Sequence, residues 1–253
     1  SYMFQSASSF DQPLNNWDTG NVTNMSHMFE YAYDFNQPLN NWDTSKVTNM
    51  SYMFARYGWE TVGFNQPLGS WDTSKVTNMS YMFNKSTYFN QSLASWDVAS
   101  VTNMSSMLAE SGLSTPNYDA TLLAWSGQSL KANVTLGATG LKYCTAQSVR
   151  QGIITNHTWT ISGDSLQCTP PSSPQNLAVT VNQGVFKLTW QAPSTYGLGV
   201  FTGYTLQYKL SSASSWTTEP STTLLSADVM GLNPGVQYDF RVTAVSTHGS
   251  STP

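Results

Sequence analysis

Hydrophobic and polar positions repeat with a period of about 25 residues along the first part of the chain. Its tryptophans recur with spacings of 25, 29 and 25 residues, at Trp17, Trp42, Trp71 and Trp96. A Val-Thr-Asn-Met segment follows the same spacings, beginning at Val22, Val47, Val76 and Val101. A unit of this size cannot bury its apolar face alone, but stacked units can. The pattern therefore predicts a solenoid over residues 1–110.

Within one repeat, the spacing of apolar residues predicts a short helix that follows a short strand. The hydroxyl of Ser51 suits a helix N-terminus. Around it, an apolar stripe at helical spacing consists of Met50, Met53, Phe54 and Tyr57. The β-branched centre of residues 46–50 favours a strand just before it. The first fold class is therefore an α/β right-handed solenoid with short parallel strands and short helices.

One repeat is longer than the others, because four extra residues lie between Phe54 and Phe64. Insertions in solenoids lie on one face, which often binds, and aromatic and arginine side chains dominate binding surfaces. The predicted ligand contacts are therefore Arg56, Tyr57, Trp59 and Glu60. The tryptophan ladder of the regular repeats is expected in the core instead.

Beyond residue 110 the period breaks, but helix and strand signals still alternate. Thr115-Pro116 predicts a helix start and Gly127 its end, while residues 133–136 and 158–161 suit strands. Residues 111–169 are therefore expected to close the solenoid as a cap. Cys144 and Cys168 flank the last helix and strand and would form one disulfide in an exported protein. Two free thiols in a cytosolic chain are the alternative.

The last part of the chain alternates in the manner of an all-β sandwich. Residues 170–174 form a stiff, proline-rich linker, and short alternating runs fill residues 175–253. The chain reaches Pro253 where a seventh strand would begin, so the last strand is expected to be missing. Because Ser1 falls inside a repeat, the chain is interpreted as a piece of a longer exported protein.

Composition excludes several classes of function. Only 9% of the residues are charged and the net charge is −4, with no Lys/Arg cluster to bind a phosphate backbone, so no nucleic acid is expected as a partner. No apolar run is long enough to span a membrane. The three histidines, His27, His157 and His248, are scattered, and no catalytic or metal-ligand motif occurs. No enzymatic activity and no cofactor are therefore expected.

Two ladders of polar residues leave alternatives open. One ladder of carboxylates consists of Asp18, Asp43, Asp72 and Asp97. They could bind calcium between repeats, but local turns in which each carboxylate accepts nearby N–H groups are favoured. Threonine rows, Thr23 to Thr102 and Thr19 to Thr73, could form an ice-binding face, although strand propensity explains them equally well.

The repeat motifs resemble those of BspA-like bacterial surface proteins, a leucine-rich-repeat relative. The resemblance rests on Phe35-Asn36-Gln37-Pro38-Leu39 and on the Trp-Asp and Val-Thr-Asn-Met segments. The last part resembles the fibronectin type III family, an immunoglobulin-like sandwich, through Trp190, Tyr204 and the turn Leu232 to Tyr238. The first resemblance implies display on the cell surface and attachment to other molecules, with no residue-specific site to carry over.

Together these features predict an extracellular, cell-surface adhesion or ligand-binding segment, with the sandwich as a spacer. Its partner would be a protein or glycan on another cell or matrix, or copies of the chain itself. The alternative is a structural stalk or filament subunit without a small ligand, and a lesser one is an ice- or calcium-binding repeat.

Overall fold

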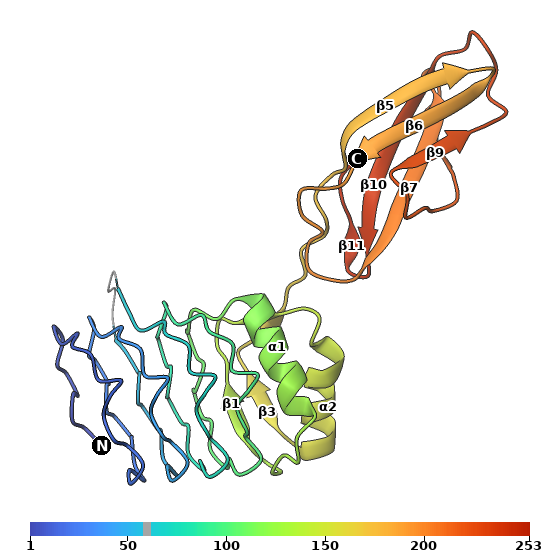
Figure 1. Cartoon of the computed structure of the whole chain (residues 1–253). Helices are drawn as coiled ribbons and strands as arrows, with labels where there is room; N and C mark the ends of the chain where they lie inside the picture. The colour runs from blue at the N-terminus through green and yellow to red at the C-terminus, as the bar shows by residue number, and fades with distance from the viewer. Residues whose placement is uncertain (58–61) are drawn as a thin grey trace. The chain divides into compact units, whose positions relative to one another are not determined.

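The chain forms two compact units, Ser1–Gln167 and Cys168–Pro253. The computed structural model describes residues 1–57 and 62–253. The first unit consists of stacked turns of chain followed by two helices, and the second contains two antiparallel sheets (Figure 1). The repeats and the cap thus belong to a single unit.

Successive repeats are joined by parallel backbone hydrogen bonds at alternate residues. The N–H groups of Met25, His27, Phe29 and Tyr31 donate to carbonyls of the next repeat at 2.9 to 3.0 Å. The partners are Asn49, Ser51, Met53 and Ala55. Regular strand pairing is reduced to one parallel bridge in each repeat, at Asn24, Asn49, Asn78 and Asn103. The expected short strands are therefore single bridges.

The helix expected after Ser51 is not formed, and that prediction was wrong. Residues 51–54 are turns, in which the Met53 N–H donates to Met50 O and the Ala55 N–H to Tyr52 O. Overlapping turns with bonds three residues apart bring apolar side chains to one side, as a helix would. They also leave alternate N–H groups free to join the next repeat, whereas a helix would use those groups internally.

The interior of the repeats consists of ladders of identical side chains. Phe29, Phe54 and Phe83 stack with ring centroids 5.6 Å apart. The tryptophan rings stack at 6.4 Å, as Trp42 on Trp71 and Trp71 on Trp96. Each indole N–H donates to a leucine carbonyl of the preceding repeat, at Leu14, Leu39 and Leu68. The one polar atom of each of these three buried rings thus has a partner, and they belong to the core as predicted, whereas Trp17 in the first repeat is 41% exposed.

The cap continues the stack with larger elements. Helix α1 (Thr115–Ser126) packs beside α2 (Gln147–His157) (Figure 1). Two parallel strand pairs complete it: β1 (Thr135–Gly137) with β3 (Thr160–Ser162), and β2 (Lys142–Tyr143) with β4 (Ser165–Leu166). The Trp125 indole donates to Leu93 O at 3.2 Å, the contact that tryptophans make in the repeats. Helix α1 therefore occupies the place of a further repeat.

The second unit is a β-sandwich. One sheet contains β5 (Gln175–Asn182), β6 (Val185–Gln191) and β9 (Ser226–Val229). The other contains β7 (Phe201–Leu210), β8 (Thr217–Thr218), β10 (Tyr238–Ser246) and β11 (Gly249–Ser250). Its core includes Leu188, Trp190, Tyr204, Leu206 and Val242. At the position expected for the seventh strand, the two-residue β11 pairs with Val245 and Ser246 at the end of β10.

Candidate functional site: a tyrosine-lined groove

An aromatic ladder lies on the outer surface of the repeats. The rings of Tyr2, His27, Tyr52 and Tyr81 stack in that order, with centroids 4.4 to 4.6 Å apart. All four residues have a left-handed backbone, with φ of 58° to 61°. This conformation costs a non-glycine residue on the order of 1 kcal/mol, which a stacked aromatic pair can offset. The repeated conformation fixes the rings in register.

A groove of about 270 Å³ opens beside Tyr52 and Tyr81. Its lining residues are Tyr31, Tyr52, Ala55, Arg56, Tyr57, Tyr81 and Asn84. The corresponding position of the two adjacent repeats carries a larger polar side chain, Glu30 and Asn84, where this repeat has Ala55; the first repeat has Gln5 there and the last has Ala109. The short side chain of Ala55 therefore leaves the space that forms the groove.

The longer repeat turns Tyr57 outward. Its counterparts in the adjacent repeats, Ala32 and Ser86, are buried, whereas Tyr57 is 62% exposed. The other repeats have a left-handed residue one position earlier, at Ser6, Tyr31, Lys85 and Glu110, but Arg56 is not left-handed. The Phe54 carbonyl accepts a hydrogen bond from the Ser86 hydroxyl. In the other repeats, the corresponding carbonyl accepts one from a backbone N–H. The chain thus leaves the regular turn pattern at Arg56 and presents Tyr57 at the rim.

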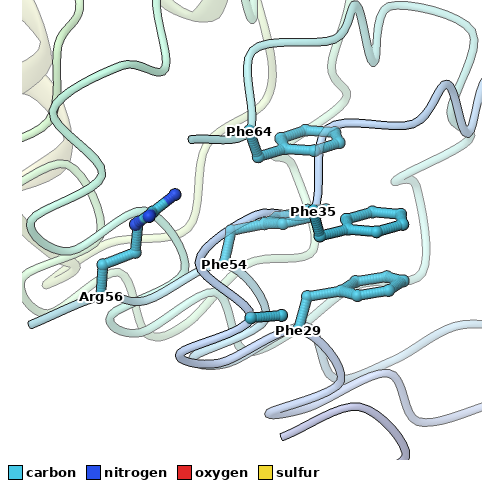
Figure 2. A pocket seen from close by; sticks show the side chains of 6 residues that line it. Phe29, Phe35, Phe54, Arg56 and Phe64 are labelled. Carbon is cyan, nitrogen blue, oxygen red and sulfur yellow. The ribbon is translucent and has the colours of Figure 1, made fainter. Parts of the chain in front are cut away.

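The Arg56 side chain lies inside the wall of the groove and joins two segments of backbone. It is 7% exposed, and Nη2 donates to Tyr33 O at 3.0 Å and to Val62 O at 2.8 Å. Arg56 also borders an internal gap of about 10 Å³ beside the parallel rings of Phe29, Phe35 and Phe64 (Figure 2). That gap has room for about one water molecule, so the outer groove is the space for a ligand.

The structure brings together part of the predicted contact set. Arg56 and Tyr57 both line the groove, while Trp59 and Glu60 lie outside the described residues. Tyr31, Tyr52, Tyr81 and Asn84 also line the groove and were not predicted from the sequence. A signal was available at Ala55, since this small residue stands between Glu30 and Asn84 of the adjacent repeats, although Ala109 recurs at the same position in the last repeat.

The charged groups around the groove are unevenly placed. Lys85 Nζ lies 4.7 Å from the centroid of the Tyr57 ring. The lining residues that the structure describes include no carboxylate. The neighbouring Glu30 carboxylate is hydrogen-bonded to Gln5 Nε2 and His27 Nδ1, each 2.6 Å from Oε2. Burial, and then the charge of Glu30, raise the pKa of Tyr31 to about 12. At neutral pH the Tyr31 phenol is therefore protonated and able to donate a hydrogen bond.

The raised tyrosine pKa values predict loss of stability in alkali. Burial raises the pKa of Tyr31 from 10.0 to about 12 and that of Tyr118 well above its ordinary value. The folded state therefore holds more protons than the unfolded state above pH 10, and the free energy of unfolding should fall as pH rises from about 10 to 12. Urea titrations and phenolate absorbance at 295 nm measure this effect. In the control Tyr31→Phe the fall should be smaller; an equal fall would contradict the assignment.

The aspartate ladder and the second threonine row have local hydrogen-bond partners. Each aspartate Oδ1 accepts the backbone N–H two residues on, from Gly20, Ser45, Ser74 and Ala99. Hydrogen bonds from Ser45 and Ser74 hold the pKa of Asp43 and of Asp72 below the usual value. In the second threonine row, Thr19, Thr44 and Thr73 are buried and donate to aspartate carbonyls of the next repeat. That row cannot form a surface array.

Residues 1–59 and 57–132 match the family model described as Mycoplasma protein of unknown function, DUF285. The chain belongs to the DUF285 family. Residues 172–253 match the fibronectin type III domain model, which confirms that part of the fold prediction. The predicted disulfide is also confirmed, since neither Cys144 nor Cys168 is a free thiol. In the described part of this DUF285 chain, no helix is both long and apolar enough to cross a bilayer.

Similar curated proteins include the neogenins of mouse and human, 35% identical over 120 residues and 36% identical over 121. These matches cover 44% of this chain, which spans less than a tenth of the neogenins' length (8% in both). Among solved structures, titin domains A168–A170 are 25% identical with a TM-score of 0.33, over 36% of this chain and 31% of titin's. A human FNIII domain is 26% identical with a TM-score of 0.32, over 34% and 74%.

Proposed function

We propose that this DUF285 chain is a non-catalytic, extracellular adhesion segment that binds a ligand on another cell or matrix through the tyrosine-lined groove. The repeat family, the fibronectin type III domain and the disulfide support an extracellular location, because disulfides persist in oxidising compartments. The sandwich serves as a spacer in this proposal. Descent of the repeats from leucine-rich repeats is part of the same proposal.

One observation carries the proposal: several tyrosines from successive repeats line one groove whose floor is a small residue. Tyr31, Tyr52, Tyr57 and Tyr81 surround Ala55. Tyrosine supplies a large contact area with a polar tip and little rotamer entropy, and it is enriched at binding surfaces. Stacking of Tyr52 on Tyr81 at 4.6 Å holds part of the wall in place before a ligand arrives. Such preorganisation favours affinity.

Two variants of the whole chain test the groove, with binding to a glycan array and to cultured cells as the readouts. Tyr57→Ala removes the exposed ring and is expected to weaken binding by about tenfold or more. Ala55→Gln should fill the floor and weaken binding as well, while the fold persists because Gln5 occupies the same position in the first repeat. Urea denaturation of both variants checks their stability.

Tyr88→Ala is the matched control. Tyr88 is 41% exposed in the same unit and does not line the groove. Its loss should leave binding within about twofold of the wild type, because exposed residues outside a binding site contribute little. Equal binding by wild type, Tyr57→Ala and Ala55→Gln would exclude the groove as the contact surface.

A further inference from the structure

We propose that the groove binds a carboxylated saccharide and that Lys85 pairs with the sugar's carboxylate. This inference rests on the proposed function and adds the chemical class of the ligand. Its grounds are the size of the groove, the groups that line it, and the lysine beside it.

The space suits a sugar unit better than a peptide. At about 270 Å³ the groove is near the small end of ligand sites. A peptide strand would need free backbone partners. The backbone groups here already bond between repeats, since Tyr31 N–H donates to Ala55 O and Arg56 N–H to Asn84 O. Recognition must therefore come from side chains.

Those side chains combine aromatic surface with hydrogen-bonding tips. The rings of Tyr31 and Tyr57 meet edge to face, 5.8 Å apart and inclined at 61°, so they form two angled walls. Phenol hydroxyls and the Asn84 amide supply donors and acceptors. A pyranose has apolar C–H faces and a rim of hydroxyl groups, which match these two kinds of surface.

Charge selects an acidic sugar. Of the residues that the structure describes, none forms an ion pair with Lys85. The ammonium instead lies over the Tyr57 ring at 4.7 Å, beside the groove. Among the lining residues that the structure describes, none carries a carboxylate, and the nearby Glu30 carboxylate is hydrogen-bonded to Gln5 and His27. Lys85 is therefore the charged partner for a ligand. An anionic group on the ligand would gain a charge-assisted hydrogen bond there.

Isothermal titration calorimetry of the whole chain tests the inference with matched pairs of probes. These are sialyllactose against lactose, and a hyaluronan hexasaccharide against its carboxyl-reduced form. At least one acidic probe should bind about tenfold more tightly than its neutral partner, the effect of one hydrogen bond to a charged group. Lys85→Gln should remove this preference, and Lys85→Arg should retain it.

Lys75→Gln is the control, because Lys75 is exposed on the same unit and lies outside the groove. The inference is overturned if neither acidic probe binds, if acidic and neutral partners bind equally, or if Lys85→Gln keeps the preference. Its failure can be told from that of the proposed function. Loss of array or cell binding in Tyr57→Ala, together with no effect of Lys85→Gln, would retain the groove and reject only the carboxylate assignment.

Discussion

Replacement of Trp96 by alanine is expected to lower the free energy of unfolding of the first unit by about 4 kcal/mol. The Trp96 ring is fully buried, 6.4 Å from Trp71 and 6.1 Å from Phe83 between centroids. Its indole N–H donates to Leu68 O at 3.0 Å. The substitution leaves a cavity and removes one of the two hydrogen bonds to Leu68 O, which keeps the one from the Trp71 N–H. The cavity is the main cause of the loss. Urea denaturation followed by circular dichroism measures the loss.

Trp17→Ala is the control at the same position of the repeat. Trp17 is 41% exposed, so its removal creates no enclosed cavity. The expected loss is below about 1 kcal/mol, as for most substitutions at exposed sites. Equal losses in the two variants would mean that position in the repeat, rather than burial within the ladder, determines the contribution of tryptophan.

The ladders could be predicted from the sequence, but the backbone between them could not. Identical residues in the same place of each repeat lie above one another in a stacked coil, so the stacking of Trp42 on Trp71 followed from the repeat motifs even across the four-residue insertion. The helix after Ser51 did not follow. Turns and helices both bring residues three apart to one face, and the left-handed residues His27 and Tyr52 are not glycines that would have marked the turns.

The irregular repeat indicated where the candidate site lies, but the sequence identified only some of the residues that line it. The insertion pointed to Arg56 and Tyr57, which both line the groove, but the Arg56 Nη2 donates to Tyr33 O and Val62 O inside its wall. Tyr57 is exposed because the chain leaves the regular turn pattern at Arg56. The spacing of residues in the sequence does not predict that point. Tyr52 and Tyr81 were not predicted to line the site, because they recur with the repeat period, as residues that only pack between repeats also do.

Replacement of Arg150 by methionine is expected to lower the free energy of unfolding of the first unit by about 3 to 5 kcal/mol. The Asp164 side chain is completely buried and forms a two-point ion pair with Arg150, in which Nε donates to Oδ2 at 2.7 Å. Without the guanidinium, Asp164 would retain the Tyr118 hydroxyl, at 2.9 Å, from this cluster. A buried carboxylate lacking its counter-charge is the reason for the large effect.

The double variant Arg150→Met with Asp164→Leu distinguishes two causes of destabilisation. One is loss of the attraction within the ion pair, and the other is the buried Asp164 carboxylate left without a counter-charge. If the penalty of Arg150→Met arises from the unpaired Asp164 carboxylate, removing that carboxylate as well should restore part of the stability, because apolar groups of similar volume can replace a buried ion pair. The Tyr118 hydroxyl then loses its bond to Asp164, which limits the recovery. Urea denaturation of the wild type, both single variants and the double variant completes the cycle. Additive losses would instead show that the pair stabilises the cap through independent packing of each side chain.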